Sequence, residues 1–251
     1  MKTGHIPVLA GRAVEYLLAG GEKGVWIDAT LGRAGHSMLI LQRMPPGSVL
    51  IGIDKDEDAI KESAEIIGKR PDFVAVRSAF SSIREIAEQY APGGVNGVIF
   101  DFGVSSPQLD DAQRGFSFMK DAPLDMRMDR SQKLTAYEVV NTYSRERLEK
   151  ILLEYGEERF ASRIAGEIIN RRPFKTTLEL AEVAERAVRT REKIHPATRL
   201  FQAIRMEVND EVSEISAGLK AAVEVLKPHG RIVAISFHSI EDRLVKRFFA
   251  R

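Results

Sequence analysis

Short apolar runs alternate with helical patterns over the first hundred residues, and this order limits the possible folds more than any other feature of the chain. The runs lie at 25–30, 49–53, 73–76 and 97–100, and apolar residues recur at helical spacing between them. A further run at 231–237 predicts a fifth strand. Strands joined by helical crossovers lie parallel to one another. We therefore expect an α/β protein with a doubly wound, mostly parallel sheet.

Two of these runs end in an aspartate, at the edge where such sheets bind their ligands. Asp101 ends the fourth run and is followed by a turn rich in Gly, Ser and Pro. An isolated Asp at this position more often only ends the strand and caps the next element. Asp54 ends the second run, 22 residues after Gly32, and Asp56 is available to cap the helix that follows. This spacing is close to the ~20 residues at which an acidic side chain accepts hydrogen bonds from a ribose diol, and it favours a ligand-binding role.

The turn after the first run has the spacing Gly32-x-x-Gly35 and lacks the G-x-G-x-x-G pattern. A nicotinamide dinucleotide needs closely spaced glycines around its pyrophosphate, which this turn supplies poorly. S-adenosylmethionine carries no phosphate, so a looser turn with a carboxylate on the second strand suits it better. An oxidoreductase that uses a nicotinamide cofactor remains the alternative on this frame. Phe80, after the third run, is a candidate for stacking on an adenine, although a Phe there is more often part of the core.

Composition excludes several kinds of site. The 251 residues are 44% hydrophobic and 29% charged, as in an ordinary soluble globular protein, and none is cysteine. Disulfides, thiolate metal sites and cysteine nucleophiles are therefore excluded. The five histidines show no paired helical spacing, so we expect no metal. No run approaches the ~18 apolar residues of a membrane span and no signal peptide is visible, which predicts a cytoplasmic protein without membrane contact.

Strand signals stop after Asp101. A long polar loop at 103–134 is followed by helical periodicity from Ser144, and Thr176 with Glu179 predicts a capping box within it. We predict three segments, which are the first part of a sheet domain at 1–109, a helical insertion at 110–204, and the second part of the sheet domain at 205–251.

The helical segment is locally basic. Eleven Lys or Arg lie between Arg159 and Arg205 against five Glu, in a chain whose formal net charge is only +1. A phosphate-binding surface and an ordinary solvated helical face both account for this excess.

Several long motifs, in a fixed order from one end of the chain to the other, carry a resemblance to a known family. They resemble the bacterial 16S ribosomal RNA N4-cytosine methyltransferases, the RsmH or MraW family. Two departures are visible. Ala34 stands where the family usually has a second Gly, which predicts a negative φ there, and Phe102 stands where it usually has Leu. The motifs are DATLGRAGHS (28–37), GID (52–54), DFGVSSPQLD (101–110), RGFSF (114–118), PLDMRMD (123–129), HPATR (195–199), EVNDE (207–211) and SFHS (236–239).

The resemblance implies a Rossmann-like class I methyltransferase core, with a helical cap inserted in it that faces the RNA. It implies N4 methylation of a decoding-centre cytidine in 16S ribosomal RNA of the small ribosomal subunit, with S-adenosylmethionine as the methyl donor. Backbone contacts of Ala34, Gly35 and His36 would hold the donor. The other donor-binding residues that the resemblance implies are Asp54 on the ribose, Phe80 and Asp101 around the adenine, and Gln108.

The chemistry agrees with the residues present. Methylation at carbon 5 of a pyrimidine usually needs a cysteine nucleophile, whereas an exocyclic amine needs in-line placement and acceptors for its hydrogens. Ser106 and Pro107 loosely resemble the short motif by which other amino-methyltransferases hold their base, and we expect Ser106 Oγ to accept an amine hydrogen while Asp101 orders the turn. Arg127 and Arg199 are candidates for holding RNA phosphates, by analogy of motif and charge. A non-catalytic RNA-binding assembly factor is a second alternative.

Overall fold

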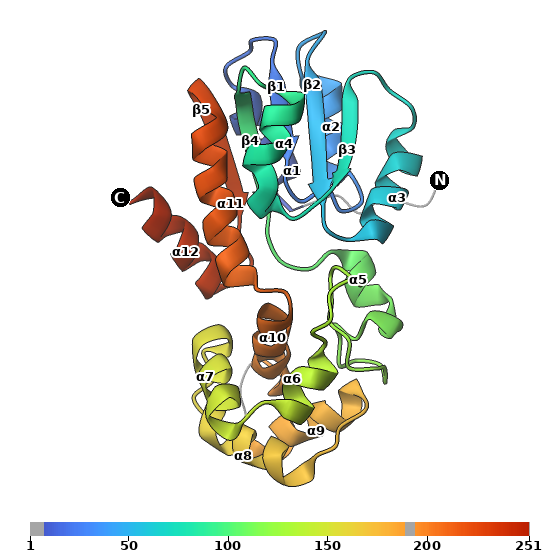
Figure 1. Ribbon diagram of the computed structural model, residues 1–251, viewed down its shortest axis with the longest axis vertical. Helices are drawn as coiled ribbons and strands as arrows, with labels where there is room; N and C mark the ends of the chain where they lie inside the picture. The colour runs from blue at the N-terminus through green and yellow to red at the C-terminus, as the bar shows by residue number, and fades with distance from the viewer. Residues whose placement is uncertain (1–7, 189–193, 251) are drawn as a thin grey trace. The chain divides into compact units, whose positions relative to one another are not determined.

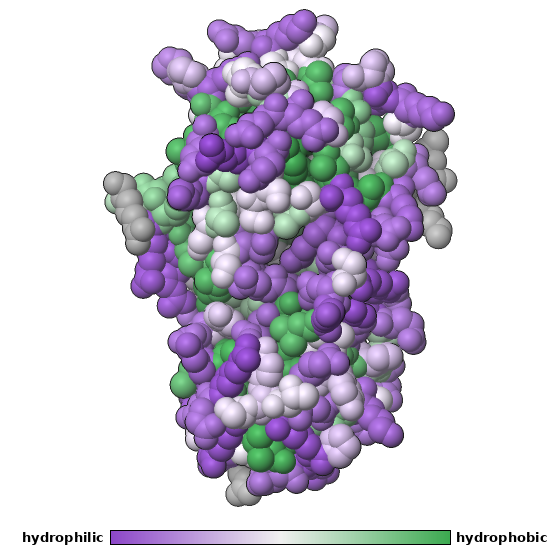
Figure 2. Space-filling view, viewed as in Figure 1, coloured by the Kyte–Doolittle hydropathy of each residue, from purple (hydrophilic) through white to green (hydrophobic). Residues whose placement is uncertain are grey.

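The computed structural model describes residues 8–188 and 194–250, and the chain divides into two compact units (Figure 1). The sheet unit comprises Met1–Gly103 and Val212–Arg251, and the helical unit comprises Val104–Glu211. The sequence placed the insertion at 110–204, and its role as an RNA-facing cap stays a prediction. Figure 2 shows that polar side chains cover most of the visible face of each unit. None of the helices in the described ranges is long and apolar enough to cross a membrane.

Five parallel strands form the sheet in the order β3-β2-β1-β4-β5. Each of the strand runs expected from the sequence is present, and the doubly wound α/β prediction is confirmed. β1 lies between β2 and β4, and helical crossovers join β1 to β2, β2 to β3 and β3 to β4. The strands are β1 (Val25–Asp28), β2 (Val49–Asp54), β3 (Phe73–Arg77), β4 (Val95–Asp101) and β5 (Leu226–Ile235).

Helices cover both faces of this sheet, because successive strand residues point to opposite sides. Trp26 and Leu50 pack in one hydrophobic core with α1, α2 and α3, while their neighbours Ile27 and Ile51 pack in a second core with α4 and α11. The helical elements of this unit are α1 (Ala10–Leu18), α2 (Gly35–Arg43), α3 (Glu57–Ile67), η1 (Phe80–Ser82), α4 (Ile83–Tyr90), α11 (Glu211–Val225) and α12 (Ser239–Phe249).

The helical unit has its own core, formed by the apolar faces of the five helices α6 to α10 and by the loop before α6. The predicted helix starts are confirmed. Ser144 accepts a hydrogen bond from Arg147 N at the start of α7, and Thr176 with Glu179 forms a capping box at the start of α9. The elements are α5 (Ser106–Asp110), η2 (Ala112–Arg114), α6 (Ala136–Thr142), α7 (Arg145–Gly156), α8 (Ala161–Arg171), α9 (Thr177–Ala187) and α10 (Ala197–Val208).

A buried asparagine holds the long loop of this unit to the end of α10. Asn209 is 3% exposed, and its Oδ1 accepts a hydrogen bond from Met128 N at 2.8 Å. Its Nδ2 donates to Met126 O at 2.8 Å and to Arg205 O at 2.9 Å. Met126 has φ +60, an uncommon conformation for a long side chain, so these bonds hold a strained part of the loop in place. The EVNDE and PLDMRMD motifs therefore meet through one amide side chain.

We predict that Asn209→Ala lowers the free energy of unfolding of the helical unit by about 2–4 kcal/mol, because buried backbone groups lose their partners. Denaturant unfolding followed by circular dichroism measures the change. Asn170→Ala, at an exposed position of the same unit, is the control and should change stability by less than about 0.5 kcal/mol. Equal stability of the two variants would contradict the role given to Asn209.

Candidate active site

Three carboxylates come together at the carboxyl edge of the sheet because of strand register. Asp28, Asp54 and Asp101 each end their strand, and β1 lies between β2 and β4. Asp28 is paired with Gly52 of β2 and with Ile99 of β4, so the three strand ends lie within about two residues of one another. The sheet thus brings the two predicted acidic residues to one edge, with a third between them.

Asp54 is held by the backbone of the two turns beside it. Its Oδ2 accepts a hydrogen bond from Gly32 N and its Oδ1 accepts one from Asp56 N, both at 2.9 Å. Burial raises the pKa of Asp54 to about 6, and these two hydrogen bonds oppose the rise without cancelling it. Each carboxylate oxygen keeps a further lone pair, so the group can also accept hydrogen bonds from a diol.

Asp28 belongs to a buried polar chain that the sequence analysis did not assign to the site. The side chain is 1% exposed, and its Oδ2 accepts a hydrogen bond from Ser37 Oγ at 2.6 Å. Its Oδ1 accepts one from Thr30 N at 3.2 Å, while Thr30 Oγ1 accepts one from Asp101 N at 2.7 Å. Burial raises the pKa of Asp28, and the nearby His36 opposes this rise. The signal in the sequence was a lone acid at the end of an otherwise apolar strand.

The prediction of a negative φ at Ala34 is wrong. Ala34 has φ +59 and Gly32 has φ +47, so the turn between β1 and α2 contains two left-handed residues. The turn is closed by a hydrogen bond from Ala34 N to Leu31 O at 2.8 Å, and Ala34 is fully buried. A left-handed alanine costs roughly 1–2 kcal/mol, which the surrounding packing offsets. Closure of the turn by this hydrogen bond accounts for the left-handed conformation of Ala34.

His36 lies beside Asp101 at the start of α2. Its Nδ1 is 3.6 Å from Asp101 Oδ2, and the side chain is 4% exposed. Its Nε2 is buried and makes no hydrogen bond with any residue in the described ranges. A buried nitrogen left in this way is the kind of atom that a bound ligand satisfies.

Phe80 follows β3 and packs with two aromatic rings at the end of β4. Its ring centroid lies 5.8 Å from that of Phe100 and 6.0 Å from that of Phe102. The side chain is half-buried against the core on this face of the sheet. Stacking on an adenine therefore stays a prediction beside the core role that the structure shows.

Ser106, Pro107 and Gln108 begin α5 in the helical unit. Gln108 Oε1 accepts a hydrogen bond from Ser105 N at 3.0 Å, as part of a capping box, and Gln108 is 7% exposed. The half-buried Ser106 makes no side-chain hydrogen bond to any described residue. A local structural role thus accounts for Gln108, whereas Ser106 keeps its hydroxyl available.

The two arginines proposed for phosphate contacts are bonded within the helical unit. Arg127 makes a bidentate pair with Asp125, at 2.8 and 2.9 Å, and donates to two backbone carbonyls. Arg199 Nη1 lies 3.8 Å from Oε2 of Glu158, which is 2% exposed. Their roles in RNA binding stay predictions, and the internal contacts give each a structural role as well.

The basic excess of the helical unit is partly used for internal bonds. Arg163 donates to Ala187 O, Arg172 donates to two carbonyls of α6 and the residue after it, and Arg205 pairs with Glu211. Counting charges along the sequence cannot separate such bonds from a free basic surface. Three of the eleven basic residues counted between Arg159 and Arg205 lie outside the described residues, namely Arg189, Arg191 and Lys193.

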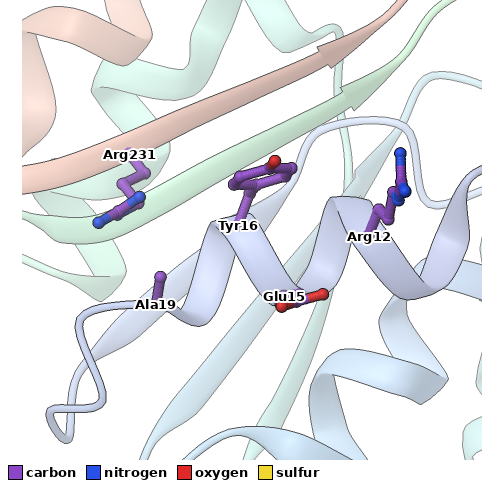
Figure 3. A pocket seen from close by; sticks show the side chains of 5 residues that line it. All are labelled: Arg12, Glu15, Tyr16, Ala19 and Arg231. Atoms are coloured by element: carbon purple, nitrogen blue, oxygen red, sulfur yellow. The ribbon is translucent and has the colours of Figure 1, made fainter.

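An open depression occurs elsewhere in the sheet unit, between α1 and β5 (Figure 3). Arg231, which lines it, is paired with Gly97 near the start of β4, four residues before Asp101. None of the predicted site residues lines this depression. The lining residues are Arg12, Glu15, Tyr16, Ala19 and Arg231.

The carboxyl edge suits S-adenosylmethionine better than a phosphate-bearing cofactor. Three carboxylates favour a cationic sulfonium and would repel a pyrophosphate. The acceptors of Asp54 suit a ribose diol, and the unsatisfied Nε2 of His36 leaves a buried polar position for the ligand. When bound, the cofactor would supply an electrophilic methyl group.

The comparison with known proteins agrees with this geometry. The model of the MraW methylase family matches residues 2–251. Three similar proteins, each named ribosomal RNA small subunit methyltransferase H, come from Carboxydothermus hydrogenoformans, Caldicellulosiruptor bescii and Herminiimonas arsenicoxydans. They are 52%, 49% and 48% identical to this chain over 100%, 98% and 98% of its length, and over 82%, 81% and 78% of their own. The chain therefore belongs to the MraW methylase family.

Proposed function

We propose that this protein transfers the methyl group of S-adenosylmethionine to the N4 amino group of a decoding-centre cytidine in 16S ribosomal RNA. The observation that carries the proposal is the cluster of three carboxylates at the carboxyl edge of the sheet, in a chain of the MraW methylase family. The name shared by the relatives supports ribosomal RNA of the small subunit as the substrate. The choice of the N4 position and of the site in the RNA rests on the motif resemblance.

The residues of the sheet edge would bind and orient the donor. Asp54 accepts hydrogen bonds from the ribose, and the backbone of the 34–36 turn contacts the rest of the molecule. Phe80 and Asp101 lie near the adenine, with Gln108 as a further contact. The carboxylates stabilise the positive charge of the sulfonium when the donor binds, so the same groups give affinity and select against phosphate.

Ser106 would prepare the amine for attack. The N4 lone pair of cytosine is delocalised into the ring, and acceptors for the amine hydrogens draw it back to the nitrogen. We assign this role to Ser106 Oγ and a nearby backbone carbonyl, with Pro107 and Asp101 fixing the turn. Methylation at carbon 5 would usually need a cysteine nucleophile, and the chain contains no cysteine.

The target base must leave its stack to reach such a site, which costs a few kcal/mol. Contacts with the RNA backbone stabilise the extruded state, and Arg127 and Arg199 are the proposed residues for them. Because both arginines also have internal partners, their contribution to RNA binding has to be separated experimentally from their contribution to stability.

The decisive experiment is transfer of a labelled methyl group to small ribosomal subunits, followed by mass spectrometry of the nucleosides. We expect N4-methylcytidine as the product. A protein that binds the subunits without transfer would be the RNA-binding assembly factor. Calorimetry with S-adenosylhomocysteine and with a nicotinamide dinucleotide tests the oxidoreductase alternative, since only the first ligand should bind.

We predict that the affinity for S-adenosylhomocysteine falls as the pH is lowered through about 6, the value to which burial raises the Asp54 pKa. Binding favours the ionised carboxylate, so affinity is highest above this pKa and is lost as Asp54 is protonated. Asp54→Asn should weaken binding about tenfold or more and remove most of the pH dependence. Calorimetry between pH 5 and pH 8 measures both effects, with Asp56→Asn as the control. A pH-independent affinity of the natural protein would contradict the role of Asp54.

We predict that Ser106→Ala slows a single turnover about tenfold or more at saturating donor, because one acceptor of the amine hydrogens is lost. Rapid quenching of a labelled methyl-transfer reaction measures the rate. Ser162→Ala, at an exposed position of the same unit, should keep the natural rate. If Ser106→Ala reacts at the natural rate, the hydroxyl has no part in the chemistry.

We predict that Arg199→Gln weakens binding of small-subunit RNA, because one phosphate contact is lost. The slope of the logarithm of the binding constant against the logarithm of the salt concentration should fall in magnitude by about one. Titrations at several salt concentrations measure the slope. Glu158→Gln breaks the same ion pair without removing a cation, so it controls for loss of stability. An unchanged slope for Arg199→Gln, or an equal change for Glu158→Gln, would show that Arg199 is structural.

A further inference from the structure

Three aromatic rings in contact with one another in the helical unit join two motifs, RGFSF (114–118) and HPATR (195–199). His195, from the HPATR motif, lies parallel to Phe118, from the RGFSF motif, with centroids 4.6 Å apart and an interplanar angle of 24°. Phe118 in turn meets the buried Phe201 edge to face at 5.1 Å. Phe118 and His195 are 77 positions apart in the sequence. A ladder of rings therefore runs from the core of the unit to its surface.

The outermost ring presents a flat face to solvent. The His195 side chain is 42% exposed although Phe118 covers one face of its ring, so the exposed area lies on the other face and the edges. Residues adjoining the two rings in the sequence are also exposed and apolar, with Met119 78% and Ile194 44% exposed. Exposed apolar residues next to an exposed ring in the sequence are typical of an interaction surface.

Both nitrogens of the imidazole are already engaged, which fixes the ring in place. Nδ1 accepts a hydrogen bond from Ala197 N at 3.2 Å, and Nε2 lies 3.2 Å from Glu185 Oε1. Glu185 supplies a negative charge at the ring edge, so the site does not select for a phosphate. What remains is a rigid planar surface, which suits the neutral face of an unpaired base.

We propose that His195, backed by Phe118, is a stacking platform for an unpaired nucleobase of the RNA substrate. This inference rests on the proposed function for the identity of the RNA, and it adds a base-binding position to the helical unit. Stacking on an aromatic face tolerates any base, so the platform would hold a nucleotide without reading its identity. It would stabilise the opened form of the RNA that base extrusion requires.

Two substitutions of His195 separate stacking from a purely structural role. His195→Phe keeps a flat ring but loses the acceptor for Ala197 N and the contact with Glu185. His195→Asn keeps a short acceptor for Ala197 N but removes the ring. Tyr137→Leu, which removes an exposed aromatic ring elsewhere in the same unit, is the control for a general loss of surface aromatics.

The probes are small ribosomal subunits and a single-stranded oligoribonucleotide carrying 2-aminopurine, whose fluorescence is quenched when the base stacks. We expect His195→Asn to weaken binding of both about tenfold and to lose the quenching. His195→Phe and Tyr137→Leu should remain within about threefold of the natural protein. The opposite order, with Asn behaving as the natural residue and Phe as the damaged one, would overturn the platform and leave His195 as a structural residue.

The failure of this inference can be told from the failure of the proposed function. If the natural protein methylates subunits and His195→Asn binds them as tightly, only the platform is wrong. If no methyl transfer occurs, the proposed function is wrong, and quenching of the oligoribonucleotide by the natural protein and its loss in His195→Asn still decide the platform. Calorimetry with S-adenosylhomocysteine should give the same affinity for all three variants, which shows that the sheet unit is intact.

Discussion

Parallel pairing of β1 with both β2 and β4 is the constraint on which the site depends. It places the ends of three neighbouring strands at one edge, and each of these strands ends in an aspartate. Carboxylates in such a place lose much of their hydration, which raises the pKa values of Asp28 and Asp54. Backbone N–H groups of the adjoining turns replace part of the lost water, as at Gly32 and Asp56. The edge therefore has preformed acceptors and negative charge, which would suit a ligand that is cationic and rich in hydroxyl donors.

Much of this arrangement could be predicted because it depends on local signals. Alternation of apolar runs with helical patterns identifies the strands, and in a parallel sheet their carboxyl ends must lie at one edge. The distance from Gly32 predicts a ligand-binding role for Asp54, which stays a prediction. The sequence also predicts that Asp56 caps the next helix, and the structure confirms this cap. Helix starts at Ser144 and Thr176 are likewise set by side-chain bonds within one turn of the chain.

What could not be predicted depends on contacts between distant segments. The left-handed conformation of Ala34 follows from closure of the turn between β1 and α2, which overrides the preference of alanine. The hydrogen bonds of Asn209 cross more than 80 residues of sequence. Arg127 illustrates a further limit, because its charge suggested an RNA contact while its guanidinium is bonded within its own loop. Sequence reports which groups are present, whereas their partners are decided by the fold.

The chemistry proposed for the two units places different demands on them. Donor binding needs rigidly held acceptors, which strand ends supply because backbone pairing holds them on both sides. Extrusion of a base from a folded RNA costs a few kcal/mol and needs compensating contacts that tolerate many sequences. Stacking meets this need, since every base has a flat face, and a ring fixed at both nitrogens loses little freedom on binding. The His195 and Phe118 pair thus has the rigidity that the extruded state requires. Side-chain packing supplies this rigidity in the helical unit, whereas strand register supplies it at the sheet edge.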